Sequence, residues 1–358
     1  MLNKKMVKMR IALVANTNSI HTTRWANWLK NKGNIVKKFS LKQTSDSIFF
    51  GPEPPLDRSL IMNFGNKIRK TTKKLQTLVD DFKPDLVHGC FLTNCGFYAS
   101  RLTNYPIVVQ VMGSDLLVHQ EKSWLLSWIV KNSIKNSSLI ISPPLLIEKL
   151  KRLGITDNQI HSNLIGIDTT LFKPLEKQNT VLFNRGFEEI YNPLVVAEAI
   201  IKVSKKNPNI KFFLSGEGAL KEKVEQLLQN RNVEFTGQLS EKKMSEIMGI
   251  SKIVISPSLS DSIPLTAFEA MSCGSILVAS DIPAHRQWEN YGHPIFFFDK
   301  EDAGTLANHI LELYNNQEVI DKALNIGPKL VKNNWDREII SKKIFERYIK
   351  TINDFQKK

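Results

Sequence analysis

The sequence has few cysteines and no long hydrophobic run. Its 358 residues include only Cys90, Cys95 and Cys273, whose spacing fits neither a metal-ligand motif nor a disulfide framework. No apolar stretch approaches the roughly twenty residues that a membrane-spanning helix requires. The basic opening MLNKKMVKMR leads into a short strand pattern rather than the hydrophobic region of a signal peptide. We therefore expect free thiols, no structural metal and a cytoplasmic protein.

Acidic residues are scarce in the first half of the chain. Up to residue 172, 24 Lys and Arg face 11 Asp and Glu, a net charge of +13, whereas the remainder holds 25 against 24, a net charge of +1. This asymmetry indicates an anionic partner for the first half, such as a phospholipid surface, a lipid pyrophosphate or a nucleic acid. A lysine-rich proteome would also raise the charge, although that bias should act on both halves.

Apolar strand patterns alternate with amphipathic helix patterns along the whole chain, which is typical of parallel sheets covered by helices on both faces. The alternation restarts after GIDTTLFKP, so the sequence predicts an α/β protein with two doubly wound domains and a ligand cleft between them. The expected domains are residues 1–170, residues 171–335, and a C-terminal helix over 336–358 that packs back on the first domain. Trp335, Ile339, Ile340, Ile344 and Tyr348 form a helical stripe near this end.

Individual elements follow from the same periodicities. Residues 40–64 are expected to be irregular, with prolines at 52, 54 and 55. Strands are expected at 10–16, 34–39, 85–88, 106–112, 138–142, 159–165, 179–184, 210–214, 233–236, 253–256, 275–279 and 294–298, and helices of the first half at 22–31, 66–82, 93–102, 123–135 and 144–153.

Two carboxylates mark the stretch SLSDSIPLTAFEAMSCGSILVASDIPAHRQW, which reads as a strand, a polar loop, a helix and a second strand. With the helix starting near Pro264, Asp261 lies on the loop and Glu269 on the second helical turn, so both can face one ligand. The unpaired N–H groups at the helix start suit a phosphate. The alternative is that Asp261 caps the helix and Glu269 is solvated, and spacing alone does not decide between the two.

Several motifs together resemble those of the retaining glycosyltransferases of family four, the group 1 glycosyl transferases, which have the GT-B fold of two Rossmann-like domains. The stretch with Asp261 and Glu269 is similar to the E-x7-E signature, with Asp in place of the first Glu. The other matching motifs, in chain order, are VANTNSIHTTRWANWLKNKG, PDLVHGCFLTNCGFYAS, VVQVMGSDLL, NLIGIDTTLFKP and SGEGAL.

The resemblance implies a role for each matching residue. Arg185, at the end of VLFNRG, would stabilise the departing diphosphate, although a surface arginine at a strand end is the simpler alternative. Glu269 would accept hydrogen bonds from the ribose hydroxyls, and Asp261 would bind hydroxyls of the transferred sugar. The catalytic candidates are thus Arg185 and Asp261, and the expected donor-binding residues are Asn18, Gly113, Ser114, Arg185, Asn192, Gly216, Glu217, Asp261, Ser262, Ile263, Pro264, Leu265 and Glu269.

Two departures from the family pattern affect the site. Ile190 stands where the family usually has a second phosphate-binding lysine, which leaves Arg185, the helix start and the Asn192 amide for that task. Met112 stands where a histidine often precedes the Gly-Ser-Asp turn. The acceptor-side candidates are therefore His21, His88 and Asp115, although a lone histidine is more often structural.

The implied activity is retaining, metal-independent transfer of a hexose from a nucleoside-diphosphate sugar, as co-substrate and without another cofactor, to a glycan or lipid-linked acceptor in surface polysaccharide or glycolipid synthesis. The alternatives are a nucleotide-sugar epimerase of GT-B fold and a non-catalytic binder of sugar nucleotides or nucleic acid. Nucleic acid is not expected, because the chain lacks a basic-aromatic motif.

Two helices of the first half are candidates for contact with an anionic membrane. Residues 66–82 are basic on one side, and residues 123–135 place Trp124, Leu125, Trp128 and Ile129 on one stripe. Such a stripe fits a membrane interface or the protein core equally well. With the basic excess, it leads us to expect peripheral attachment at the inner face of the membrane.

Overall fold

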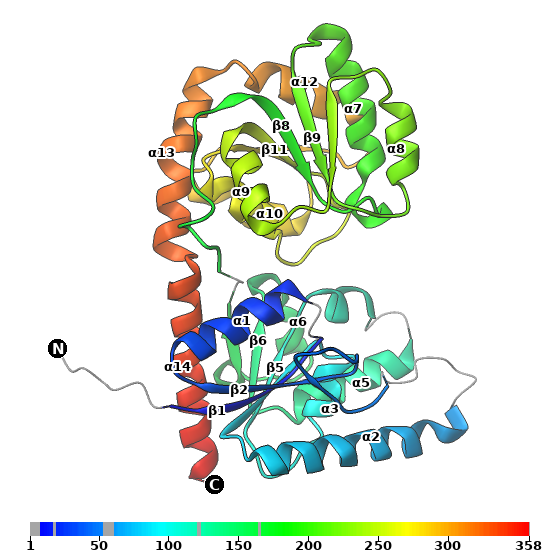
Figure 1. Cartoon of the computed structure of the whole chain (residues 1–358), viewed down its shortest axis with the longest axis vertical. Coiled ribbons are helices and arrows are strands. Elements are labelled where there is room, and N and C mark those ends of the chain that lie inside the picture. The colour runs from blue at the N-terminus through cyan, green and yellow to red at the C-terminus, as the bar shows by residue number, and fades with distance from the viewer. Residues whose placement is uncertain (1–7, 17–18, 53–60, 120–122, 164–165, 358) are drawn as a thin grey trace, which may run out of the picture. The chain divides into compact units, whose positions relative to one another are not determined.

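The computed structural model describes residues 8–16, 19–52, 61–119, 123–163 and 166–357, and it divides the chain into two compact units (Figure 1). The first unit consists of Met1–Leu164 and Ser341–Lys358, and the second of Ile165–Ile340. Each unit contains one parallel sheet with helices packed on it. The expected α/β class with two doubly wound sheets is confirmed.

The sheet of the first unit has seven parallel strands in the order β3-β2-β1-β4-β5-β6-β7. Its central strands are buried on both faces, as in β6, where all four residues are buried. The elements are β1 Arg10–Val14, α1 Ile20–Asn31, β2 Ile35–Ser40, β3 Ile48–Phe49, α2 Ile61–Phe82, β4 Leu86–Cys90, α3 Cys95–Ala99, β5 Ile107–Gln110, η2 Asp115–His119, α5 Trp124–Lys135, β6 Leu139–Ser142, η3 Pro144–Leu146, α6 Ile147–Arg152, η4 Asp157–Gln159 and β7 Ile160–Ser162.

The sheet of the second unit has six parallel strands in the order β10-β9-β8-β11-β12-β13, so the chain reverses its direction of winding between β8 and β11. Ligands of such sheets bind where the strand order reverses, beyond the carboxyl ends of the strands. The elements are β8 Gln178–Asn184, η5 Glu189–Tyr191, α7 Pro193–Lys206, β9 Lys211–Ser215, α8 Lys221–Leu227, β10 Val233–Gly237, α9 Glu241–Ile250, β11 Ser251–Ser256, α10 Leu265–Ser272, β12 Ile276–Ser280, α11 Pro283–Arg286, η6 Glu289–Tyr291, β13 Ile295–Phe298, α12 Ala303–Leu313 and α13 Gln317–Asn334. The last helix, α14 Arg337–Gln356, begins in this unit, and its residues from Ser341 onward belong to the first unit.

A partly buried lysine is hydrogen-bonded to the C-terminal end of α10. The ammonium group of Lys177 donates to the carbonyls of Ser251 (2.8 Å) and Cys273 (2.9 Å) and to the hydroxyl of Ser275 (2.9 Å). Burial lowers the pKa of Lys177 to about 8. Gly274 then ends the helix with φ +65°, a conformation that glycine adopts without strain.

The region over residues 40–64 differs from the expectation of an irregular segment. The two-residue strand β3 pairs with the end of β2, and α2 begins at Ile61, five residues before its expected start. Phe50 after β3 is fully buried and packs edge-on against Tyr98, with ring centroids 5.7 Å apart. Tertiary packing on one aromatic side chain therefore fixes a strand too short to show a periodic pattern. Residues 53–60 lie outside the described part of the chain.

The C-terminal stripe is wrong as a single helical face. Trp335 lies in the turn between α13 and α14, where its ring contacts Phe268 (centroids 4.8 Å apart) and Trp288 (5.4 Å) in the second unit. By contrast, Ile344 and Tyr348 on α14 are buried in the first unit. The helical spacing of these residues is real, but the chain passes from one core to the other within it.

None of the helices in the described residues is both long and apolar enough to cross a membrane.

Candidate donor site

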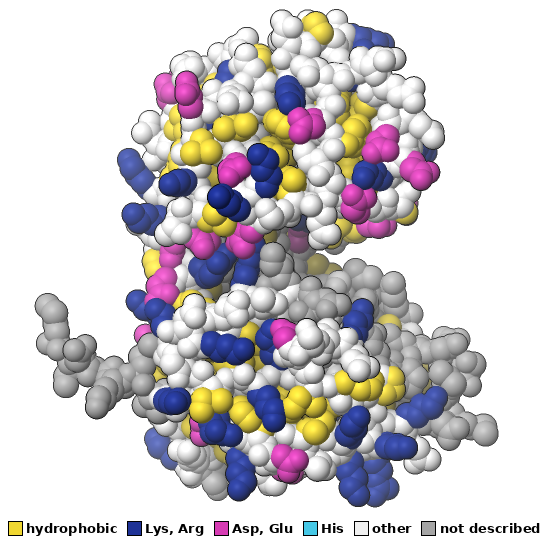
Figure 2. Space-filling view, viewed as in Figure 1, with side chains coloured by type: hydrophobic (Ala, Val, Ile, Leu, Met, Phe, Trp, Pro, Cys, Tyr) yellow, Lys and Arg dark blue, Asp and Glu magenta, His cyan; other side chains and the backbone are white. Residues whose placement is uncertain are grey.

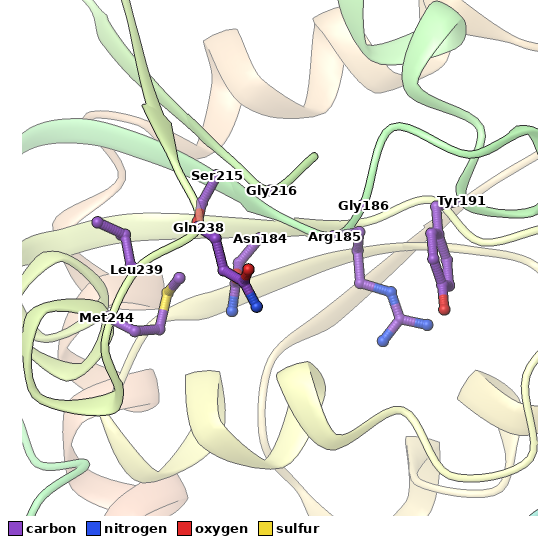
Figure 3. A pocket seen from close by; sticks show the side chains of 9 residues that line it. All are labelled: Asn184, Arg185, Gly186, Tyr191, Ser215, Gly216, Gln238, Leu239 and Met244. Atoms are coloured by element: carbon purple, nitrogen blue, oxygen red, sulfur yellow. The ribbon is translucent and has the colours of Figure 1, made fainter. Parts of the chain in front are cut away.

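A pocket of about 250 Å³ lies at the carboxyl edge of the sheet in the second unit. Figure 3 shows Arg185 and Tyr191 side by side at one end and Leu239 and Met244 at the other. The pocket therefore has a charged end and an apolar end. The lining residues come from the ends of β8, β9 and β10, from η5 and from α9: Asn184, Arg185, Gly186, Tyr191, Ser215, Gly216, Gln238, Leu239 and Met244.

Gly216 allows two strand ends to approach each other closely. It has φ +127°, and a Cβ atom there would lie 2.6 Å from the carbonyl oxygen of Arg185. Its N–H donates to the carbonyl of Gly237 (2.9 Å), which joins the ends of β9 and β10. The glycine expected from the SGEGAL motif thus shapes the wall of the pocket with its backbone.

Arg185 is held between an aromatic ring and a carboxylate. Its Nη2 lies 2.5 Å from Oδ2 of Asp261, and the side chains are 14% and 13% exposed. The guanidinium also stacks on the Tyr191 ring, 4.6 Å from the centroid. Within the described residues, its buried Nε–H has no hydrogen-bond acceptor. A buried donor without an acceptor is costly, so this end of the pocket favours an anionic ligand.

The loop before α10 bonds to itself. Oδ1 of Asp261 accepts from the N–H groups of Ser262 (2.7 Å) and Ile263 (3.2 Å), and the N–H of Leu265 donates to the Ile263 carbonyl (2.9 Å). Pro264 has no N–H and precedes the first residue of α10. The N–H groups of Ser262, Ile263 and Leu265, which we expected to bind the donor, are therefore bonded inside the loop in this structure.

Glu269 lies on the second turn of α10, as expected, and is 9% exposed. The first turn of the same helix is tied to the end of β8, because the Thr266 hydroxyl donates to the Asn184 carbonyl (3.3 Å). Asn184 in turn lines the pocket. The helix that carries Glu269 is thereby fixed against the strand that carries Arg185.

A buried histidine belongs to a hydrogen-bond network that reaches the start of the loop before α10. Nδ1 of His285 lies 2.9 Å from the Ser280 carbonyl, which can only accept, so this nitrogen carries the proton and Nε2 accepts from the Ser256 hydroxyl (3.0 Å). The Ser280 hydroxyl donates to the carbonyl of Ser258, at the start of the loop (2.6 Å). Burial lowers the pKa of His285 to about 4. Sequence reasoning missed this network because its partners meet only when β11 and β12 pair.

Two residues expected in the donor site have other partners. The Asn192 amide donates to the Lys300 carbonyl (2.6 Å), while its backbone enters α7 with φ +50°. The Glu217 carboxylate accepts from Lys221 (2.9 Å), and its side chain is 57% exposed. Among the residues described as lining the pocket, Arg185 alone carries a formal charge. In this structure the Asn192 amide thus bonds to Lys300, and its role in place of the family's lysine stays a prediction.

The Gly113–Asp115 turn belongs to the first unit. Asp115 is fully buried and accepts from the backbone N–H groups of Gly113 (2.8 Å) and Leu92 (3.1 Å). Burial raises its pKa and these N–H groups oppose that effect. Gly113 has φ +111° and Ser114 is exposed. In this structure the Asp115 carboxylate thus stabilises the turn from inside, and its assignment to the acceptor side stays a prediction.

Of the two histidine candidates, the structure describes the side chain of His88 alone. His88 on β4 is 1% exposed, its Nδ1 contacts the Tyr348 hydroxyl at 2.5 Å, and burial lowers its pKa to about 3. In this structure His88 is therefore part of the core, and its acceptor-side role stays a prediction. Asn18 lies outside the described residues, and so does the side chain of His21, whose backbone is in the first turn of α1.

The apolar end of the pocket was not predicted from the sequence. Gln238 and Leu239 follow β10 and precede Ser240, which caps α9 by accepting from the Lys243 N–H (3.3 Å). The sequence does contain a signal here, a strand followed by Gly237 and a helix cap. Such a junction places backbone and side chains at the carboxyl edge of a parallel sheet. Which strand end would face Arg185 depends on the strand order.

Comparison with known proteins gives consistent matches over both units. The family model described as glycosyl transferase 4-like matches residues 10–143, and the model described as glycosyl transferases group 1 matches residues 169–329. The sulfoquinovosyl transferase SQD2 of Arabidopsis thaliana is 27% identical over 326 residues, which are 83% of this chain and 64% of that protein. The chain therefore spans less than two thirds of the length of this relative.

Solved structures share the fold at low identity. The sucrose-phosphate synthase of Thermosynechococcus elongatus matches with a TM-score of 0.76 and 16% identity over 97% of this chain and 100% of that one. HepE of Anabaena, crystallised in complex with UDP and glucose, matches with a TM-score of 0.73 and 15% identity over 94% and 98%. Both likenesses concern the fold alone.

Proposed function

The chain belongs to the glycosyltransferases with the GT-B fold, and from this premise we propose that it transfers a hexose from a nucleoside-diphosphate sugar to a glycan or lipid-linked acceptor, with retention of configuration. The observation that carries the proposal is Arg185, whose buried Nε–H has no acceptor among the described residues, beside Asp261 at the carboxyl edge of the sheet. Both residues lie in the stretch matched by the group 1 family model.

The two ends of the pocket suit the two ends of a nucleotide. Leu239 and Met244 would pack on the base, while Arg185 would neutralise the diphosphate (Figure 3). Glu269 would accept from the ribose hydroxyls and Asp261 from hydroxyls of the sugar. HepE, which shares the fold, was crystallised with UDP and glucose, so uridine nucleotides are the first donors to test.

The proposed chemistry requires no nucleophilic carboxylate, metal ion or further cofactor. As the bond between the sugar and the diphosphate breaks, negative charge grows on the leaving oxygen, where the Arg185 guanidinium stabilises it. The acceptor hydroxyl attacks from the face that the diphosphate leaves, through an oxocarbenium-like transition state. Its proton passes to the departing phosphate, so no protein base is assigned.

Donor turnover is the first experiment. The protein is incubated with a panel of nucleoside-diphosphate sugars and glycan or lipid-linked acceptors, and the released nucleoside diphosphate is measured. We expect release that depends on the acceptor and falls about 10- to 100-fold in Glu269→Ala, because hydrogen bonds to a charged group contribute about 1.5–3 kcal/mol.

The matched control is Glu246→Ala, which removes a partly exposed glutamate on α9 that pairs with Lys243. Equal turnover of Glu269→Ala and the parent would contradict the site. Conversion of the donor sugar without acceptor or nucleotide release would instead favour an epimerase, and nucleotide binding without any conversion a non-catalytic protein.

We also propose that the first unit contacts an anionic membrane through α5, at the cytoplasmic face. The four-residue stripe expected here splits in two: Leu125 and Ile129 are buried in the core, whereas Trp124 is 63% and Trp128 is 40% exposed. An exposed tryptophan pair on one helical face is typical of a membrane interface.

Positive charge accompanies these tryptophans. Lys131 and Lys135 are exposed and continue the helical spacing of Trp124 and Trp128. Arg101 packs on the Phe97 ring (5.3 Å from the centroid), which Trp128 also contacts with ring centroids 6.0 Å apart. In Figure 2, lysines and arginines outnumber acidic side chains on the visible face of the first unit.

Vesicle flotation tests this surface. We expect the protein to float with anionic liposomes at low salt and to release at high salt, because the attraction is screened. Replacing Trp124 and Trp128 by alanine should reduce the bound fraction about tenfold or more, since each indole buries apolar area at the interface. The control pair is Leu227→Ser and Phe355→Ser, at exposed positions elsewhere. Equal binding to neutral and anionic vesicles would contradict the proposal.

A further inference from the structure

The Arg185–Asp261 ion pair joins two side chains that have separate tasks in the proposed function. Arg185 would bind the diphosphate and Asp261 the hydroxyls of the sugar, yet Nη2 and Oδ2 are 2.5 Å apart. Each group is therefore the other's partner where no ligand contacts them. A donor that uses both must compete with this contact.

The pair is built into its surroundings. Asp261 is fixed from one side by the N–H groups of Ser262 and Ile263 on Oδ1, so Oδ2 is the oxygen that faces Arg185. Arg185 is fixed on the other side by the Tyr191 ring. Figure 3 shows the guanidinium beside this ring at the charged end of the pocket.

A backbone hydrogen bond joins the loop that carries Asp261 to the turn that carries Tyr191. The N–H of Leu259, in the loop of Asp261, donates to the carbonyl of Ile190 in the turn that carries Tyr191 (2.8 Å). The stacking ring, the arginine and the aspartate loop therefore form one assembly. Small rotations of the arginine side chain can redirect its N–H groups without breaking this frame.

The charges determine which partner Arg185 prefers. A diphosphate presents more negative charge and more acceptor oxygens than a single carboxylate, so it competes well for a planar guanidinium. When Arg185 turns to the diphosphate, Oδ2 of Asp261 loses its cation and becomes free to accept from a hydroxyl. Its Oδ1 remains bonded to the loop, which keeps the carboxylate in place.

We propose that Arg185 is a shared group whose transfer from Asp261 to the diphosphate exposes the carboxylate that binds the sugar. Recognition of the nucleotide thereby precedes recognition of the sugar. For a hexose that carries no nucleoside diphosphate, the Asp261 carboxylate remains paired with Arg185. This inference rests on the proposed function. It adds that Asp261 lowers the affinity for the nucleoside diphosphate while it supports transfer of the sugar.

Asp261→Asn separates these effects, because asparagine keeps the Oδ1 acceptor for the loop and removes the charge. Binding of UDP without a sugar is measured by titration calorimetry, alongside the released nucleotide in turnover. We expect Asp261→Asn to bind UDP about 3- to 10-fold more tightly than the parent, a factor limited by solvent screening of a partly exposed pair. Its turnover of the donor should fall at the same time.

The matched control is Asp281→Asn, which removes one negative charge from the same unit but from an exposed pair with Arg286. It should leave UDP affinity and turnover unchanged. If Asp261→Asn melts much lower than the parent, Asp261→Ser keeps a hydroxyl acceptor for the Ser262 N–H and repeats the test.

The outcomes are distinct. UDP affinity in Asp261→Asn that is equal to or weaker than in the parent overturns the inference and leaves the proposed function standing. Equal tightening in Asp281→Asn also overturns it, since the effect would then follow net charge. If neither UDP nor any other nucleoside diphosphate binds the parent, the proposed function fails, and the inference with it.

Discussion

Replacing Arg185 by alanine is expected to lower kcat/KM for the donor by about 100- to 1000-fold, the typical loss when a positioned donor to a developing negative charge is removed. Arg185 is the one charged side chain among the residues described as lining the pocket, so no neighbour there replaces it. Because the leaving diphosphate gains charge in the transition state, most of the loss should appear in kcat rather than in KM.

Arg286→Ala is the matched control, since this arginine is exposed and pairs with Asp281 and Glu289 in the same unit. It should leave kcat/KM within about twofold of the parent, as surface pairs contribute little. Arg185→Lys keeps the charge but loses the planar fork, and we expect intermediate activity. Similar rates for Arg185→Ala and Arg286→Ala would show that Arg185 does not stabilise the leaving group.

Acid should destabilise the second unit well before its carboxylates are fully protonated. Burial lowers the pKa values of His285 and His293 to about 4, from an ordinary value of 6.5. Between these limits the unfolded chain binds more protons than the folded one, so the free energy of unfolding falls as the pH falls from about 6.5 to about 4. At pH 5 the loss is about 2 kcal/mol for each histidine, or about 4 kcal/mol for both.

Thermal unfolding followed from pH 7 to pH 4.5 measures this effect. His285→Asn cannot take up the proton, so the stability of this variant should depend less steeply on pH by about one proton. At pH 7 the variant should be less stable than the parent, because the bond that joins Ser256 to the ring is changed. An unchanged pH dependence would show that the pKa of His285 does not differ between the folded and the unfolded protein.

Much of the fold could be predicted from the sequence, because a parallel sheet buried on both faces needs continuous apolar strands. The expected strand at 253–256 lies within β11, and the helix expected to start near Pro264 corresponds to α10, which begins at Leu265. Short elements without a periodic pattern could not be predicted, as β3 shows. The position of Trp335 could not be predicted either, because periodicity does not reveal which of two cores receives a residue.

The site could be predicted in part for similar reasons. Arg185 and Asp261 stand in recognisable motifs, and the structure brings them into contact. His88 and Asp115 have the right residue types, but burial decides their roles, and burial depends on distant partners such as Tyr348, 260 positions away from His88. Gln238 and Leu239 were missed because strand order, rather than local pattern, places them beside β8.

The last helix places part of the core of the first unit after the whole second unit in the sequence. Residues 341–358 belong to the first unit, where Tyr348 is fully buried against His88 and Trp25. In the order of synthesis, residues 165–340 of the second unit are therefore made before the last part of the first unit's core. The unit that is begun first is finished last, although domains usually fold in the order in which they are made. Until Tyr348 is made, the ring of Trp25 lacks the edge-on contact that it has in the folded unit.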